Sequence, residues 1–327
     1  MLKKMLWIFT GILVILIIAF VAGPRPTFKK IDNKPSSKSY DIETLDYEVA
    51  KREAAVQFLK PDNEARVVWA DSIPSKTKYS LVYLHGFSAS QAEGAPVHIN
   101  LAKRLGANLY LPRLSGHGID TKEAMSNLTP GILIKNAKDA IAIGKSIGEK
   151  VIVMGCSTGG TLGIYLAAND PAIEALILLS PNIAIKDPTA AMVTGPWGEE
   201  LAYQMIGPYR EFDGTTNPYW SDKYSTNGII ALQALLDQTM TNKVFEKVTC
   251  PVYCGYYYKD EDNQDPVVSV DAMLDFKEHI GTPSAKVLFQ PFANVGNHVI
   301  ASKYKTDNWK EVEDGVFAYL QNKIVEN

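Results

Sequence analysis

Residues 150–168, KVIVMGCSTGGTLGIYLAA, decide the fold that this chain is expected to adopt. Residues 150–154 are apolar and rich in β-branched side chains, which predicts a buried strand, and residues 161–168 read as a helix packed on a sheet. Between them lies a G-x-S-x-G pattern centred on Ser157. Glycines, which have no Cβ, let a strand and a helix approach each other around a serine on strained backbone. The stretch therefore predicts a strand, a sharp serine turn and a helix.

Two upstream motifs support this interpretation, because the five-residue pattern alone is a weak signal. Residues 79–84 read as a buried strand that ends in HGF at residues 85–87, and residues 111–118 read LPRLSGHG. With the serine turn, these motifs resemble the α/β-hydrolase family, in particular its monoglyceride-lipase-like and carboxylesterase-like members, which include serine aminopeptidases. The resemblance covers roughly residues 65–327. It implies a mainly parallel α/β sheet with helices on both faces.

The resemblance also assigns the oxyanion hole. In the family, an H-G-aromatic turn supplies one backbone N–H, and the residue after the nucleophile supplies the other. These donors would be the amides of Phe87 and Thr158, with Ser157 as the nucleophile. Removal of one such donor typically costs about 3–4 kcal/mol of transition-state stabilisation.

The general base is expected among five histidines. In this fold the catalytic residues follow the order serine, acid, histidine along the chain. His298 lies in a loop after the predicted strand 285–290, where the family places its base. The other four have structural interpretations: they are His85 and His117 in the turn motifs, His98 before the nucleophile, and His279 at the end of a predicted helix.

The catalytic acid is expected in the loop after the predicted strand 251–258. Family members commonly carry Asp, one further residue and then Val in this loop, and residues 265–268, DPVV, match that pattern. Asp265 is therefore the predicted acid, Asp262 is the alternative, and Asp260 is a further competitor. The acidic stretch can also be a solvated loop. A calcium-binding loop is not favoured, because position 265 lacks the obligatory glycine.

These assignments imply nucleophilic catalysis. Ser157 would attack an acyl carbon, His298 would take its proton and return it to the leaving group, and Asp265 would fix the imidazole tautomer. The sequence shows no H-E-x-x-H zinc pattern, no P-loop and no G-x-G-x-x-G fingerprint. We therefore expect no cofactor and no metal.

The amino terminus predicts a membrane segment. Lys3 and Lys4 precede 18 uncharged residues, 5–22, which would span about 27 Å as a helix. A cleavable signal peptide is the alternative, although its apolar region is usually shorter and the cleavage sites here are poor. We expect residues 1–23 to be an uncleaved signal anchor. Because basic residues flank both sides, orientation stays open, with the catalytic domain expected on the exported side.

Composition predicts one large globular unit. Of 327 residues, 46% are hydrophobic and 21% charged, which is ordinary for a folded protein. The net charge of −3, without a basic stripe, argues against a nucleic-acid partner. Three cysteines give no disulfide framework. Cys250 and Cys254 would lie about 13 Å apart in a strand, too far for a bridge.

Three further segments complete the predicted organisation. Residues 24–62 read as a poorly ordered tether that leads into a helix at 49–59, and residues 63–327 read as the α/β domain. Alternating strands and helices favour a parallel sheet covered on both faces. Residues 186–249 interrupt this alternation and hold an aromatic group made up of Trp197, Tyr203, Tyr209, Phe212, Tyr219, Trp220 and Tyr224. In the family an insertion here forms a lid, and an aromatic roof favours an apolar acyl or aryl group.

The expected function is that of a membrane-anchored serine hydrolase that cleaves carboxylic esters, such as acyl glycerides. Its partners would be a small-molecule or lipid ester and the membrane. The same catalytic residues could serve an amidase, an aminopeptidase or a thioesterase, because specificity lies in pocket shape. A catalytically silent binding module on the same fold is the alternative from another class.

Overall fold

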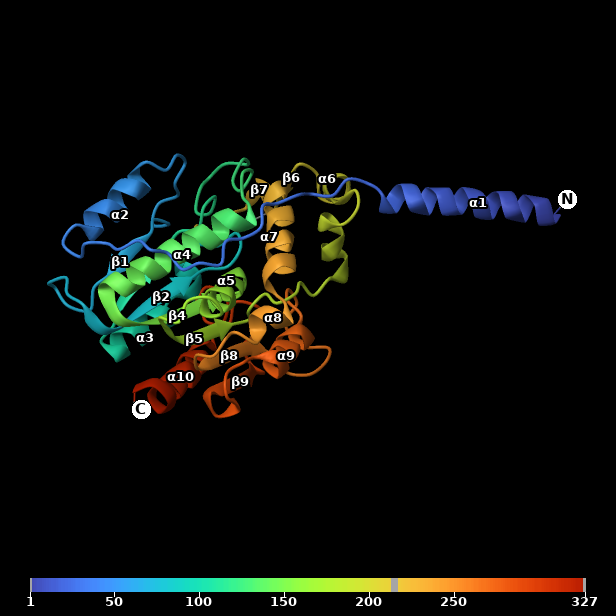
Figure 1. The fold of residues 1–327 in the computed structure, drawn as a ribbon. Coiled ribbons are helices and arrows are strands. Elements are labelled where there is room, and N and C mark those ends of the chain that lie inside the picture. The colour runs from blue at the N-terminus through green and yellow to red at the C-terminus, as the bar shows by residue number, and fades with distance from the viewer. Residues whose placement is uncertain (1, 213–216, 326–327) are drawn as a thin grey trace.

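A computed structural model describes residues 2–212 and 217–325. Its centre is a seven-stranded sheet with the order β1-β3-β2-β4-β5-β8-β9 (Figure 1). The strands are β1 (Arg66–Val68), β2 (Thr77–Leu84), β3 (Asn108–Leu111), β4 (Gly148–Cys156), β5 (Ile173–Leu179), β8 (Val252–Tyr257) and β9 (Val287–Phe292). Only β1 pairs antiparallel among them. The predicted α/β fold with a mainly parallel sheet is confirmed.

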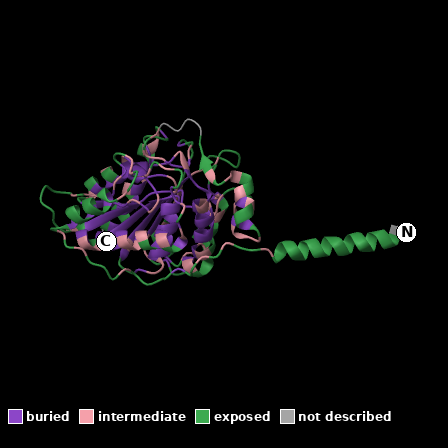
Figure 2. Cartoon of the chain, turned by 90° about the horizontal axis from the view of Figure 1, so that it is seen from above, coloured by how far each residue is buried: buried purple, intermediate pink, exposed green. Residues whose placement is uncertain are grey.

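Helices cover both faces of this sheet. On one face lie α4 (Pro130–Ile147), α5 (Thr158–Ala167) and α9 (Val270–His279), and on the other lie α3 (Val97–Leu105) and α10 (Trp309–Leu320). Side chains alternate along the strands: Val82 of β2 joins the first core and Leu81 joins the second. Both faces of the central strands are buried, as Figure 2 shows in purple, and these strands are accordingly rich in apolar residues.

The segment between β5 and β8 forms helices and two short strands at one end of the domain. Its elements are η2 (Pro188–Thr194), α6 (Gly198–Ile206), β6 (Tyr209–Glu211), β7 (Lys223–Ser225), α7 (Thr226–Thr239) and α8 (Asn242–Phe245). The hairpin β6–β7 is antiparallel, and α7 contributes Ala231 and Leu235 to the main core. Tyr224 is buried, whereas Trp197 and Phe212 are exposed. The aromatic residues of this insertion are thus divided between core and surface.

Helix α1 (Leu2–Val21) projects away from the domain with its described side chains exposed (Figures 1 and 2). Residues 3–21 are long and apolar enough to cross a membrane, a property that a signal sequence shares. The end of α1 contacts the insertion, where the Trp197 indole N–H donates to the Phe20 carbonyl at 3.1 Å. Fold and composition are therefore compatible with an anchor at this end.

The segment after α1 differs from the expected poorly ordered tether. It runs along α4 in Figure 1, with Ile31 buried in the main core and Lys38 Nζ 2.8 Å from Asp139 Oδ2. The following helix α2 (Leu45–Ala54) begins four residues earlier and ends five residues earlier than predicted. Phe58 has φ of 58°, a left-handed conformation that cannot continue a right-handed helix. Burial of Ile31 explains why a proline- and serine-rich segment lies on the domain.

Candidate active site

Ser157 lies at the turn between β4 and α5, with φ 52° and ψ −118°. This backbone conformation is rare for a residue with a side chain. A Cβ at Gly159 would collide with the Leu84 carbonyl oxygen, and one at Gly155 would collide with the Gly159 carbonyl oxygen. The two glycines therefore permit the close approach that the sequence predicted. The turn holds Ser157 at the carboxyl end of the central strand, a common place for ligand binding in open α/β sheets.

His298 and Asp265 form a buried pair. His298 Nδ1 lies 2.8 Å from Asp265 Oδ2, and Asp265 Oδ1 accepts the amides of Val267 at 2.9 Å and Val268 at 3.0 Å. Burial raises the pKa of Asp265, but His298 and these amides outweigh it and hold the pKa below its ordinary value. The carboxylate therefore accepts the Nδ1 proton. His298 Nε2 is buried and has no hydrogen-bond partner among the described residues, so its lone pair is available.

The competing carboxylates do not reach His298. Asp260 Oδ1 accepts from the amides of Asp262 and Asn263, which closes a surface turn, and these residues are exposed. The loop therefore combines both interpretations of the sequence: its first part is solvated, and its last part carries the buried Asp265. Within residues 2–212 and 217–325, no group of three His, Cys, Asp or Glu side chains could hold a metal ion.

The two predicted oxyanion donors lie next to Ser157. Thr158 begins α5, and a Cβ on Gly86, beside Phe87, would lie 3.2 Å from Ser157 Cβ. Neither the Phe87 nor the Thr158 amide donates to another group in the described part of the chain. The Phe87 ring packs edge-on against His117 and Tyr224, with ring centroids 5.5 Å and 5.3 Å away. The loop that carries this amide is thus fixed by packing.

His85 fixes the peptide that carries the Phe87 amide. The Leu114 amide donates to His85 Nε2 at 3.1 Å, so His85 Nδ1 carries the proton and donates to the Gly86 carbonyl at 2.9 Å. Burial lowers the pKa of His85 to about 3, which keeps the ring neutral. In a trans peptide the N–H points opposite to the C=O. A fixed Gly86 carbonyl therefore fixes the direction of the Phe87 N–H.

The remaining histidines occupy structural positions. His98 Nε2 lies 2.8 Å from the Gln91 carbonyl, and His117 Nδ1 lies 3.0 Å from the Ser115 carbonyl. Burial lowers the pKa of each ring to about 4. His279 is the last residue of α9, where it contacts Asp275.

The model of the α/β-hydrolase family matches residues 81–300, more than half of the chain. This chain belongs to the α/β-hydrolase family. The expected family and the expected enzyme class, a hydrolase resembling lipases and carboxylesterases, are confirmed.

Individual relatives of this α/β hydrolase agree with the assignment. A thermostable monoacylglycerol lipase of Bacillus sp. (strain H-257) is 28% identical over 196 residues, which cover 59% of this chain and 74% of the relative. Among solved structures, a monoacylglycerol lipase of Paleococcus ferrophilus has a TM-score of 0.60 at 16% identity, covering 79% of this chain and 98% of its own. A structure from work on the metagenome-derived lipolytic enzymes LipS and LipT has a TM-score of 0.65 at 16% identity, with coverages of 81% and 99%. At such identity the two structures show the shared fold alone.

Glu93 is a residue of this α/β hydrolase that the sequence analysis missed. It lies in η1 (Gln91–Gly94), is 2% exposed, and accepts the Gly86 amide at 2.6 Å. Burial raises its pKa to about 7. No local motif marks it, since a single Glu in a short 3₁₀ turn has neither periodicity nor a recognisable spacing. Only its position behind the loop of Gly86 reveals it.

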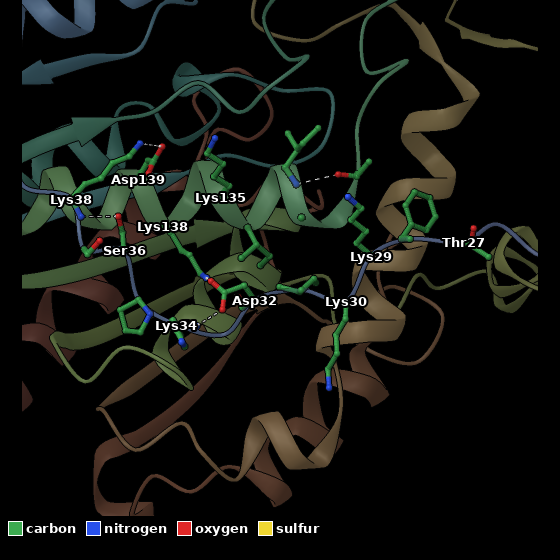
Figure 3. Close-up of a pocket in the computed structure, with 18 residues that line it drawn as sticks. Thr27, Lys29, Lys30, Asp32, Lys34, Ser36, Lys38, Lys135, Lys138 and Asp139 are labelled. Atoms are coloured by element: carbon green, nitrogen blue, oxygen red, sulfur yellow. Dashed lines mark hydrogen bonds and ion pairs between the residues drawn. The ribbon is translucent and has the colours of Figure 1, made fainter.

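A cavity of about 850 Å³ lies away from these residues, between the segment after α1 and α4 (Figure 3). Lysines dominate its lining, and two of them are neutralised by the ion pairs Lys38–Asp139 and Lys138–Asp32. Its lining includes Ser36 and Ser37 but no histidine that would pair with a buried carboxylate as His298 does. We therefore place the candidate active site of this α/β hydrolase at Ser157, not at this cavity.

Proposed function

We propose that this α/β hydrolase cleaves carboxylic esters through Ser157, His298 and Asp265. The observation that carries the proposal is the buried pair of His298 and Asp265, which leaves His298 Nε2 unpartnered in the described part of the chain. A histidine whose Nδ1–H is held by a carboxylate presents a basic Nε2 to a nucleophile. Ser157 supplies that nucleophile from a strained turn.

The first half of the reaction forms an acyl-enzyme. Ser157 Oγ attacks the ester carbonyl carbon as His298 Nε2 takes the hydroxyl proton, and the carbonyl oxygen becomes an oxyanion. The amides of Phe87 and Thr158 donate to that oxyanion. When the tetrahedral intermediate collapses, the alkoxide leaving group departs with the proton from His298, and the acyl group stays on Ser157.

The second half returns the enzyme to its starting state. Water attacks the acyl carbon and gives its proton to His298 Nε2, and the same two amides stabilise the second oxyanion. Collapse then releases the carboxylic acid and restores the Ser157 hydroxyl. Throughout, Asp265 stays ionised and stabilises the imidazolium form of His298, because its second oxygen is already held by two backbone amides.

The substrate class that we propose is an apolar acyl ester, such as an acyl glyceride. The Bacillus relative carries the name monoacylglycerol lipase. The insertion at residues 186–249, which we propose acts as a lid, contacts the loop beside Ser157: the Ser221 amide donates to the Ser88 carbonyl at 2.7 Å. The Phe87–Tyr224 contact brings an apolar surface to the same place.

We further propose that residues 1–23 anchor the enzyme in a membrane, with the catalytic domain on the exported side. The exposed apolar surface of α1 supports an anchor. Extraction of membranes at high pH should leave the full-length protein in the pellet, and amino-terminal sequencing should find Met1 or Leu2. A mature protein that begins beyond Gly23 would contradict the uncleaved anchor.

The catalytic proposal is tested with the full-length protein in detergent micelles. Nitrophenyl esters of graded acyl length are compared with a nitroanilide and a thioester, and Ser157→Ala is assayed beside the wild type. We expect ester turnover that falls by about 10⁴–10⁶ in kcat for Ser157→Ala. The acyl length with the highest kcat/KM measures the depth of the acyl pocket.

Each other outcome redirects the proposal. Faster turnover of the anilide or the thioester than of every ester would make the enzyme an amidase or a thioesterase. Equal ester turnover by Ser157→Ala would contradict the assigned nucleophile. A folded protein that turns over none of these substrates would favour a binding module on the same fold.

A further inference from the structure

We propose that Glu93 is a positioning residue for the oxyanion hole: its carboxylate holds the Gly86 amide and thereby sets the Phe87 amide toward the reacting carbonyl. This inference rests on the proposed serine hydrolase function. It adds a residue that contacts no substrate and acts through the backbone of the loop at residues 85–90, here called the oxyanion loop.

Glu93 contacts the oxyanion loop directly. Glu93 Oε2 accepts the Gly86 N–H at 2.6 Å and the Tyr83 hydroxyl at 3.0 Å. Its other oxygen faces the loop, since a Cβ on Gly86 would lie 2.7 Å from Glu93 Oε1 and 3.2 Å from Ser157 Cβ. The buried carboxyl group thus lies directly against Gly86.

Gly86 connects this contact to the oxyanion donor. Gly86 is held at both of its polar groups: its N–H donates to Glu93, and its carbonyl accepts from the neutral ring of His85. Two fixed groups on one glycine leave its φ and ψ little freedom. The Phe87 N–H belongs to the next peptide and points opposite to the Gly86 carbonyl. Glu93 and His85 therefore fix the Phe87 amide together.

The surroundings of Glu93 favour a proton acceptor. Tyr83 of β2 donates its hydroxyl, and the Cys156 thiol at the end of β4 acts to lower the pKa of the carboxyl group. Burial raises the pKa values of both Tyr83 and Cys156, so each remains a protonated donor. His98 of α3 packs edge-on against the Tyr83 ring and is neutral above pH 4. His298 also acts on Glu93, and it favours the ionised carboxylate.

The hydrogen bond between Glu93 and Gly86 should depend on pH. Because burial raises the pKa of Glu93 to about 7, the carboxylate and the neutral acid exchange within the working range of an ester hydrolase. A carboxylate accepts a shorter and stronger hydrogen bond from an amide than a neutral acid does. The hold on Gly86, and with it the geometry of the Phe87 donor, should therefore strengthen as pH rises through about 7.

The experiment compares Glu93→Gln with the wild type in full-length protein, by the pH dependence of nitrophenyl-ester hydrolysis. The ratio of the two kcat values removes the pH dependence that the two proteins share. We expect a ratio near one at pH 5.5 that rises through about pH 7 to a plateau of roughly 10 at pH 8.5, with KM nearly constant. This loss is smaller than the 10²–10³ that removal of a whole oxyanion donor causes. A plateau distinguishes the loss of the carboxylate from a mere displacement of the pH profile, which would change the ratio only over the displaced part of that profile.

Two further variants keep the inference falsifiable. Glu313→Gln is the matched control, because Glu313 is a buried glutamate of α10 that pairs with Asn100 and Arg104, and its kcat ratio should be flat with pH. Tyr83→Phe removes one hydrogen-bond donor from Glu93, which should raise the pKa of Glu93. The rise of kcat with pH should therefore move upward by roughly one pH unit. If Glu93→Gln does not fold, this shift carries the test.

The results separate the inference from the proposed function. If Ser157→Ala abolishes ester turnover while the Glu93→Gln ratio is flat and Tyr83→Phe moves nothing, the positioning role is wrong and the serine hydrolase stands. If Ser157→Ala retains turnover, the proposed function fails, and the inference that rests on it fails with it. A pH-dependent ratio together with an inactive Ser157→Ala supports both.

Discussion

His298 and Asp265 are 33 positions apart in the sequence, yet His298 Nδ1 lies 2.8 Å from Asp265 Oδ2. The two residues follow the adjacent parallel strands β9 and β8, so the sheet brings both loops to its carboxyl edge. Ser157 reaches the same edge at the end of β4. Sheet topology therefore gathers three distant residues at one place, as expected for an open α/β sheet.

This pairing predicts that the two aspartates proposed from the sequence differ sharply in importance. Asp265→Asn should lower kcat by about 10⁴, because the side-chain amide of asparagine does not hold the Nδ1–H tautomer of His298 as the carboxylate does. Asp262→Asn should stay near the wild type, since Asp262 is exposed in the surface turn. Steady-state kinetics on one nitrophenyl ester measures both variants, and the reverse ranking would transfer the acid role to Asp262.

The serine turn makes a second prediction, about stability. Gly159→Ala should destabilise the domain by more than about 3 kcal/mol or prevent folding, because the new Cβ collides with the Leu84 carbonyl. Gly131→Ala is the control: there a Cβ would find only Thr129 Oγ1, at 3.9 Å, and a helical alanine is favourable. Urea unfolding followed by circular dichroism compares the two. Similar midpoints would mean that the strand and helix are not in close contact at the turn.

Buried neutral histidines predict loss of stability in acid. The pKa values of His85, His98 and His117 are lowered to about 3, 4 and 4, so the folded protein stays unprotonated where the unfolded chain takes up protons below about pH 6.5. Their contribution is complete above pH 6.5 and is lost as pH falls toward 4. Each histidine should add about 1.4 kcal/mol per pH unit to the slope of the unfolding free energy. Denaturation at pH 5 and pH 6 measures that slope, and His98→Gln should reduce it by about 1.4 kcal/mol per pH unit. An unchanged slope would contradict the buried neutral ring.

Glu93 predicts a stability effect of the opposite sign. Its pKa is raised from 4.5 to about 7, so unfolding releases a proton between these values and stability falls as pH rises through this window. The cost above pH 7 should reach about 3 kcal/mol. Relative to the wild type, Glu93→Gln should therefore gain stability from pH 5 to about pH 7 and then level off toward pH 8. A constant difference in melting temperature across that range would mean that Glu93 does not titrate near neutrality.

Much of the sheet could be predicted from the sequence, because its strands are apolar runs bounded by turns. The strand predicted at 79–84 ends where β2 ends, and the strand predicted at 251–258 exceeds β8 by one residue at each end. The edge strand β9 lies two residues later than predicted and includes Pro291. A proline has no backbone N–H to donate, which an edge strand tolerates because one of its sides has no neighbouring strand. Helix α2 was placed too late, although its acidic first turn and basic last turn mark its true limits.

The site divides in the same way. Motif spacing pointed to Ser157 and to the loops of Asp265 and His298, because strands and turns leave local patterns. The residues that support the oxyanion loop leave no such local pattern. The contacts of His85 with Leu114, and of Glu93 with Gly86, depend on how turns fold back on one another. Such contacts belong to tertiary structure, and a single sequence carries no periodicity that reveals them.

Covalent labelling tests the central claim most directly. The full-length protein in detergent is treated with a fluorophosphonate, digested, and analysed by mass spectrometry, with His298→Ala as a folded comparison. The account predicts one phosphonylated peptide, modified at Ser157, and a strongly reduced labelling rate without His298. Labelling at another residue, or none in a folded protein, would contradict a serine hydrolase built on Ser157.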